Sequence, residues 1–377
     1  MMFDCIVVGA GPAGSTTAYQ LGKRGWSVLL LEKCQLPRYK PCTGAIAPSI
    51  AQLLDFDITP AIDQKLRRIR YTWQLNDPIE AVLETEEPMW VVRRDVFDQY
   101  LVDQAVQQGV TVQDGTPVKG IQFQDNAWTV NTEQGSRSAK YLVAADGADG
   151  PMAQWLGFKP EKVRQSYVLE LELSDPIDEP TMAFEFGLVK QGCLWNFPKQ
   201  QCHSLGITRF IGDKLKQPQD SLQTYARSFG CDASGGQLYP QGLKLWNGHR
   251  PLHTQQALLV GEAAALVDPM TAEGIRPAIF SGIEAAIAID SALNGNAQAL
   301  EQYSHTIQTE WGNDIQWSHR IANVFFRMQK IGYRVGIKRP TATKRLGQLL
   351  AGEIRYADLA NRVIKRISGS LLPGRES

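Results

Sequence analysis

Apolar and polar positions at the start of the chain follow a strand, turn, helix and strand order. The run FDCIVVG, residues 3–9, is apolar and β-branched, which is typical of a buried parallel strand. A helical pattern, STTAYQLGKRG, ends at Gly25, and WSVLLLEK then forms a second apolar run that closes on Glu32 and Lys33. The first fifty residues therefore predict a βαβ unit.

The middle of the chain predicts a second kind of sheet. A helix is expected over 94–108, and the alternating run VKGIQFQDNAWTVNT predicts strands within 110–145. Alternating runs separated by turn residues also occur within 66–90 and 160–250, and they predict an antiparallel sheet. We therefore expect an α/β (α+β) fold in which a Rossmann-like domain carries an inserted antiparallel substrate domain. The predicted limits are 1–65, 91–159 and 251–300 for the first domain, and 66–90 and 160–250 for the second.

Residues 301–377 are expected to form a basic helical region. One predicted apolar face contains Trp317, Ile321, Val324, Phe325 and Met328. After Pro340, a second face contains Tyr356, Leu359, Val363, Ile367 and Leu371, beside Arg355, Arg362, Lys365 and Arg366. Such helices either pack on the body of the protein or lie on an anionic membrane surface. Packing on the protein is the favoured interpretation, with peripheral membrane contact as the second hypothesis.

Composition narrows the function classes. The 377 residues contain 39 basic and 39 acidic side chains, which argues against a dedicated nucleic-acid binder. Residues 320–377 nevertheless contain 13 Lys or Arg and 3 Asp or Glu. The six cysteines show no C-x-x-C spacing and no cluster with histidine, so we expect no metal site and a reduced, cytoplasmic protein. Neither a signal peptide nor a membrane-spanning run is predicted.

The first turn has the pattern of a dinucleotide-binding site. Its residues are Gly9, Ala10, Gly11, Pro12, Ala13 and Gly14. Glycines allow a tight turn and a close backbone approach to a pyrophosphate at the helix N-terminus. Glu32 follows Gly14 by 18 residues, which suits hydrogen bonds from ribose hydroxyls. This spacing does not distinguish NAD from FAD.

Two later segments favour a flavin. The apolar run YLVAADG ends in Asp146 and Gly147, and ALLVGEAAALVDPMTAEGI contains Gly261, Glu262, Asp268, Glu273, Gly274 and Ile275 before a helix. These segments resemble the flavin-binding signatures of the glutathione-reductase-like superfamily, in its p-hydroxybenzoate-hydroxylase branch. The resemblance implies FAD, with the late helix N-terminus at the pyrimidine edge of the flavin ring. Glu262 stands where the family usually has Asp.

Three further motifs narrow the resemblance to the geranylgeranyl reductase family. They are the R-x-x-F-D-x-x-L helix from Arg94, the loop from Arg38 through Tyr39-Lys40-Pro41-Cys42-Thr43-Gly44, and Gly192-Cys193-Leu194-Trp195-Asn196-Phe197-Pro198-Lys199. The resemblance implies that Arg94 and the loop lie against the flavin. Thr43 and Cys193 depart from the family, which has glycine and tyrosine there.

This family saturates carbon–carbon double bonds of isoprenoid chains with hydride from reduced flavin N5. Cys42 is expected either to donate a proton or position substrate, or only to pack in the cofactor loop. Trp195, Phe197 and Pro198 are expected to form an apolar wall, and Lys199 to meet a diphosphate or cap a surface turn.

The electron donor is expected to be NADPH or a ferredoxin. Alternative hypotheses are an aromatic hydroxylase or halogenase on the same scaffold, and a non-catalytic flavin- or lipid-binding assembly factor.

Overall fold

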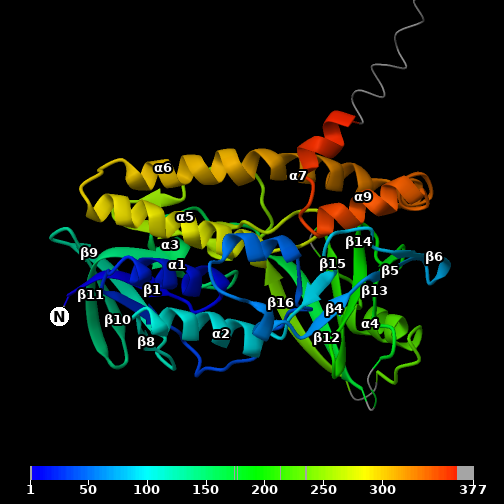
Figure 1. The fold of residues 1–377 in the computed structure, drawn as a ribbon, viewed down its shortest axis with the longest axis horizontal. Coiled ribbons are helices and arrows are strands. Elements are labelled where there is room, and N and C mark those ends of the chain that lie inside the picture. The colour runs from blue at the N-terminus through cyan, green and yellow to red at the C-terminus, as the bar shows by residue number, and fades with distance from the viewer. Residues whose placement is uncertain (1, 174, 176, 213, 234–235, 363–377) are drawn as a thin grey trace, which may run out of the picture.

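Two sheets lie side by side beneath a layer of helices (Figure 1). The computed structural model describes residues 2–362 with the exception of 174, 176, 213 and 234–235. The helices α5, α6 and α7 extend along one side of both sheets, as Figure 1 shows. This arrangement confirms the predicted mixed α/β fold.

The first sheet contains the predicted βαβ unit. Its main path runs β17-β18-β11-β1-β2-β8, and β9 and β10 extend it through β11. Parallel pairing places Cys5 opposite Val28 on one side and Tyr141 on the other. The strands are β1 (Met2–Val8), β2 (Val28–Leu31), β8 (Thr111–Gln113), β9 (Val118–Gln124), β10 (Ala127–Thr132), β11 (Gly135–Ala144), β17 (His253–Thr254) and β18 (Ala257–Leu259).

Three helices pack together beside this sheet. They are α1 (Pro12–Lys23), α2 (Arg94–Gln107) and α5 (Ile275–Leu293), and α1 contacts both of the others. Helix α1 begins directly after β1, so the amino end of the helix lies at the carboxyl edge of the parallel sheet. That edge is where α/β folds bind ligands.

The second sheet has seven strands in the order β16-β12-β15-β14-β13-β5-β6. Its pairs are antiparallel except that β5 lies parallel to β13, because the β5–β6 hairpin enters from a separate, earlier part of the chain. The strands are β5 (Arg68–Trp73), β6 (Asn76–Val82), β12 (Arg164–Glu172), β13 (Thr181–Phe186), β14 (Gly192–Pro198), β15 (Cys202–Arg209) and β16 (Gln237–Leu243). The predicted domain limits stay a prediction.

Short elements join the two sheets. A three-stranded sheet contains β3 (Ala45–Ile46), β7 (Met89–Val91) and β4 (Gln64–Leu66). The remaining short helices are η1 (Pro48–Leu53), η2 (Thr59–Ala61), α3 (Met152–Trp155), α4 (Pro218–Arg227) and η3 (Gly261–Ala264).

The C-terminal region is helical, as predicted. Its elements are α6 (Ala299–Thr306), the π-helix η4 (Ile307–Gly312), α7 (Asn313–Arg327), α8 (Gln329–Ile331), the π-helix η5 (Gly332–Ile337) and α9 (Pro340–Leu350). A further helical segment begins at residue 356, and Tyr356 is buried. The predicted positions Val363, Lys365, Arg366, Ile367 and Leu371 lie outside the described residues.

The predicted apolar face of α7 is wrong at two positions. Val324 and Met328 are 59% and 49% exposed, and Trp317, Ile321 and Phe325 are only partly buried. The buried face of α7 contains Ile315, Ser318, Ala322 and Phe326. The hydrophobic pattern did not identify this face because it includes a serine and a small alanine. No helix among the described residues is long and apolar enough to cross a bilayer.

Candidate cofactor and active site

The glycine turn leaves open space beside two cations. A Cβ atom on Gly14 would lie 1.9 Å from the carbonyl oxygen of Gly9, so the turn and α1 approach each other closely. A Cβ on Gly11 would instead have as nearest neighbours the Arg38 and Arg94 guanidinium nitrogens, at 3.9 and 4.0 Å. The backbone of Gly11 therefore faces open space with positive charge beside it, which fits a pyrophosphate.

Glu32, directly after β2, is hydrogen-bonded to the glycine turn. Its side chain is buried, and Oε2 accepts a hydrogen bond from the Ala10 N–H at 2.9 Å. The other oxygen accepts one from the Cys34 N–H at 3.2 Å. Arg38 Nε lies 3.4 Å from Oε2. The carboxylate thus lies at the predicted edge of the sheet, where a ribose would meet it.

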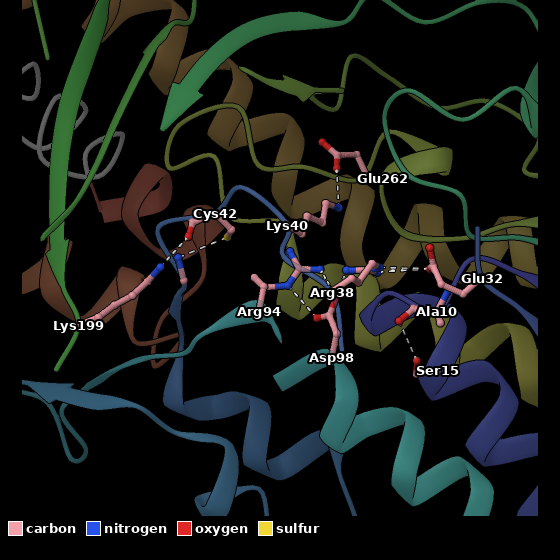
Figure 2. A network of polar contacts seen from close by, with 11 residues as sticks. Ala10, Ser15, Glu32, Arg38, Lys40, Cys42, Arg94, Asp98, Lys199 and Glu262 are labelled. Atoms are coloured by element: carbon pink, nitrogen blue, oxygen red, sulfur yellow. Dashed lines mark hydrogen bonds and ion pairs between the residues drawn. The ribbon is translucent and has the colours of Figure 1, made fainter. Parts of the chain in front are cut away.

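A buried ion cluster joins the loop after β2 to the start of α2 (Figure 2). Arg94 donates from Nε and NH2 to the two oxygens of Asp98, each at 2.7 Å, and Arg38 donates to Asp98 at 2.9 Å. Burial alone would raise the pKa of Asp98, but Arg94 and then Arg38 hold it below its ordinary value. The Asp98 carboxylate therefore fixes both guanidinium groups beside Gly11.

Lys40 points toward Glu262 on the opposite side of the site, as Figure 2 shows. The Lys40 Nζ atom lies 3.9 Å from Glu262 Oε2. Burial and the nearby Arg94 lower the pKa of Lys40, and burial raises the pKa of Glu262 although Lys40 opposes that rise. The longer side chain that replaces the family aspartate reaches this lysine.

The Cys42 loop meets the second sheet at Trp195. The Cys42 sulfur accepts a hydrogen bond from the Gly44 N–H at 3.3 Å. Burial alone would lower the pKa of Arg94. Asp98 and then the Cys42 side chain raise the pKa of Arg94 above its ordinary value. Thr43 Oγ1 accepts a hydrogen bond from the Trp195 indole N–H at 3.0 Å. Thr43, which departs from the family, therefore ties the loop to β14.

Two cavities adjoin along the glycine turn. Both are lined by Gly11, Lys40, Ala145, Gly147, Gln241 and Glu262. The first, which we call the charged half of the cleft, also has Gly9, Glu32, Lys33, Arg38 and Asp146 in its wall. The second, the apolar half, is lined by Ala45, Met89, Phe184, Trp195, Phe197, Leu243 and Leu350. Arg94, Cys42, Thr43, Glu273, Gly274 and Ile275 also line the apolar half. An elongated ligand fits across both halves.

An unsatisfied carboxylate oxygen marks the charged half. Asp146 Oδ2 accepts a hydrogen bond from the Met152 N–H at 2.8 Å, but the buried Oδ1 has no partner among the described residues. Burial raises the pKa of Asp146. A hydroxyl donor of a bound cofactor would satisfy this atom, so the residues present fit a dinucleotide.

Several predicted site residues lie outside the walls of both cavities. Gly261 packs against Ala13 of α1, and Asp268 accepts a hydrogen bond from the Tyr356 hydroxyl at 2.7 Å. Lys199 is not on a surface turn, because it is 6% exposed and pairs with Glu170 at 2.6 Å. Its Nζ also donates to the Cys42 carbonyl at 3.3 Å, so Lys199 supports the loop. The others outside the walls are Ala10, Gly14, Gly44 and Pro198.

Sequence reasoning missed Met89, Phe184, Leu243 and Leu350 of the apolar half. These residues come from β7, β13, β16 and α9. Each is one apolar position in an ordinary alternating or helical pattern, so no local signal distinguishes it from core. Asp98 was part of a quoted motif, and its spacing of four residues from Arg94 was the signal that could have identified the pair.

Known proteins share both the sequence and the fold. The family described as FAD binding domain matches residues 2–189. A digeranylgeranylglycerophospholipid reductase of Methanocaldococcus jannaschii is 28% identical over 80% of this chain and 81% of its own. One from Methanococcus vannielii is 26% identical over 82% of each chain. The chain contains an FAD binding domain and is similar along most of its length to these digeranylgeranylglycerophospholipid reductases.

Solved flavoprotein structures share the fold of this chain. A geranylgeranyl bacteriochlorophyll reductase-like protein of Thermoplasma acidophilum has a TM-score of 0.77 at 23% identity, covering 93% of this chain and 91% of its own. A flavin-dependent brominase has a TM-score of 0.73 at 19% identity, covering 98% and 100%. The chain is an FAD-dependent oxidoreductase, which confirms the predicted cofactor. The roles of the individual site residues stay predictions.

Proposed function

We propose that this protein reduces carbon–carbon double bonds of an isoprenoid lipid. The observation that carries the proposal is the cleft itself, whose charged half fits FAD and whose apolar half accepts a hydrocarbon chain. The named function of the archaeal relatives, reduction of digeranylgeranylglycerophospholipid, supports this substrate class. Reduced FAD supplies a hydride when it is bound.

Residues of both halves would hold the cofactor, because Arg94, Gly274 and Ile275 line the apolar half. Gly11 and the positive groups of Arg38 and Arg94 face the place of the pyrophosphate. Glu32 and Asp146 offer carboxylate oxygens to hydroxyl groups. The amino end of α5 at Gly274 and Ile275 offers backbone N–H groups and a helix dipole to the flavin ring.

Cys42, in the wall of the apolar half, is our proposed proton donor. Saturation of an alkene adds a hydride to one carbon and a proton to the other. The Gly44 N–H and the Arg94 guanidinium, which both interact with Cys42, would stabilise the thiolate that remains after proton transfer. Trp195 and Phe197 would hold the chain beside this sulfur.

The test is anaerobic turnover of the FAD-loaded protein with a panel of prenyl lipids, followed by mass spectrometry. Each reduced double bond should raise the product mass by two hydrogens. Cys42→Ala should retain FAD and lose most turnover, whereas full turnover by this variant would reduce Cys42 to a packing role. Oxygen-dependent modification of an aromatic substrate would favour the hydroxylase or halogenase instead. A protein whose reduced flavin no prenyl lipid reoxidises would be an assembly factor.

The electrons would come from NADPH or a ferredoxin in a separate step. Anaerobic bleaching of the flavin by each donor alone distinguishes them. We also propose a cytoplasmic protein that meets its lipid at a membrane surface.

A further inference from the structure

Four exposed apolar side chains form one row beyond the middle of α7. Val324, Met328, Ile331 and Val335 are 59%, 49%, 57% and 52% exposed. They lie close together in the sequence, from the last turn of α7 (Asn313–Arg327) through α8 (Gln329–Ile331) to the π-helix η5 (Gly332–Ile337). We call this set the exposed row. The backbone segment that carries it lies between α7 and α9, the two orange helices above the second sheet in Figure 1.

Buried anchors hold the exposed row outward. Gln329 Nε2 donates to the Gly192 carbonyl at 2.5 Å, and its Oε1 accepts from the Gln191 N–H at 2.8 Å. The Tyr333 hydroxyl donates to the Asp77 carbonyl at 2.5 Å. Because Gln329 and Tyr333 fix one side of the segment on the second sheet, Ile331 and its row face solvent.

The exposed row is embedded in a stretch without acidic residues. Residues 315–352 contain eight Lys or Arg and no Asp or Glu. Arg327, Lys330 and Arg334 are exposed, and they form no ion pair with any residue that the structure describes. Unpaired cations beside an apolar stripe are the pattern of a segment that binds an anionic bilayer surface.

We propose that residues 324–335 dock the protein on an anionic lipid bilayer. The exposed row enters the boundary between headgroups and acyl chains, and Arg327, Lys330 and Arg334 contact lipid phosphates. This surface is separate from the tail beyond Pro340 considered in the sequence analysis. A bilayer is favoured over a protein partner because every charged group of residues 324–335 is a cation, which suits a continuous anionic surface.

The docking surface adjoins the apolar half of the cleft. Phe325, Phe326 and Tyr333 pack in the same apolar cluster as Trp195 and Phe197, and Leu350 of α9 lines the cavity. Packed apolar side chains therefore connect the docking surface to the wall of the cleft. Bilayer docking does not depend on the proposed function.

Vesicle co-sedimentation of the full chain tests the docking. Vesicles of phosphatidylcholine alone are compared with vesicles that also contain phosphatidylglycerol, at low and high salt. The wild type should bind the anionic vesicles and be released by salt. A variant in which the whole exposed row is changed to Ser should have a vesicle partition coefficient at least tenfold lower than the wild type. Its changes are Val324→Ser, Met328→Ser, Ile331→Ser and Val335→Ser. The control Val82→Ser, Val106→Ser and Ile287→Ser, at exposed positions elsewhere, should leave the partition coefficient unchanged.

A second set of variants tests the charges. Arg327→Glu, Lys330→Glu and Arg334→Glu together should also reduce binding at least tenfold. Lys159→Glu, Lys190→Glu and Lys216→Glu change the net charge equally at other exposed positions and should bind like the wild type. Removal of 363–377 should leave the effect of both sets in place. Absence of wild-type binding at low salt, or equal binding by the variants, would overturn the proposal.

Turnover separates docking from chemistry. Variants of the exposed row should keep wild-type activity on a short, detergent-soluble prenyl substrate and lose activity on lipid in vesicles. If no prenyl compound is reduced but vesicle binding follows the expected pattern, the proposed function fails and the docking surface stands.

Discussion

The charged and apolar halves of the cleft are built in different ways. The charged half relies on residues of short motifs, such as Gly9 and Gly11, and on Arg38, which a buried ion cluster holds in place. The apolar half gathers single side chains from β7, β13, β14, β16 and α9. One half is therefore fixed by hydrogen bonds and charge, and the other by packing of distant elements. Substitutions should show different consequences in each half.

Removal of the carboxylate of the buried ion cluster should have the largest effect. Asp98→Asn leaves the Arg38 and Arg94 guanidinium groups without their buried counter-ion, so we expect a loss of about 3–5 kcal/mol in the free energy of unfolding. Chemical denaturation measures it. Asp95→Asn, which removes a half-exposed partner of Arg93 in the same helix, should cost less than about 1 kcal/mol.

The loss of stability in Asp98→Asn should depend on pH. The pKa of Asp98 is held below its ordinary value of 3.8, so the carboxylate stabilises the folded protein above that pH. This stability is lost as the pH falls through the lowered pKa. The difference between wild type and Asp98→Asn should therefore shrink in acid, and a difference that stays constant would contradict the assignment.

Two glycines of the turn should separate cofactor binding from folding. Gly11→Ala adds a methyl group to open space, so the unfolding free energy without FAD should change little while FAD affinity falls at least tenfold, about 1.4 kcal/mol. Gly14→Ala should instead destabilise the cofactor-free protein, because its Cβ would overlap the Gly9 carbonyl. Thermal unfolding and flavin titration measure the two quantities. Unchanged FAD affinity in Gly11→Ala would place the pyrophosphate elsewhere.

The contrast also explains what the sequence could predict. The strand, turn and helix around Gly11 follow from local spacing and were confirmed as structure. The roles of Glu32, placed by spacing, and of Arg94, placed by the family resemblance, stay predictions. Phe184 and Leu350 meet only after the chain has folded, so their sequence context shows ordinary core patterns. The surface-turn interpretation of Lys199 was wrong for the same reason, because its partner Glu170 lies on β12, 29 residues earlier.

In the apolar half, loss of the Thr43 hydroxyl should lower the free energy of unfolding. Thr43→Val removes the acceptor of the buried Trp195 N–H, which should cost about 1–3 kcal/mol in the free energy of unfolding. Gly206, opposite Trp195 in β15, has no side chain to hold the ring once this bond is lost. Thr43→Val should therefore also alter the preference for prenyl chain length. Thr43→Ser keeps the hydroxyl and should behave like the wild type; equal chain-length profiles for all three proteins would exclude Thr43 from positioning Trp195.

The smallest effect is expected at Glu262, on the boundary of the two halves. Burial raises its pKa above the ordinary value of 4.5, so the folded protein without FAD binds this proton more tightly than the unfolded chain. Stability should fall as the pH rises from about 4.5 through the raised pKa, and Glu262→Gln should remove that fall. A pKa change of one unit corresponds to about 1.4 kcal/mol, so the gain should be of this order or smaller. Unfolding measured across this range should show the variant becoming more stable than the wild type with rising pH.

The gain should be larger in a Lys40→Met background, because Lys40 lowers the pKa of Glu262 and its removal lets burial act unopposed. A gain that is the same with and without Lys40 would show that the two side chains do not interact across the cleft.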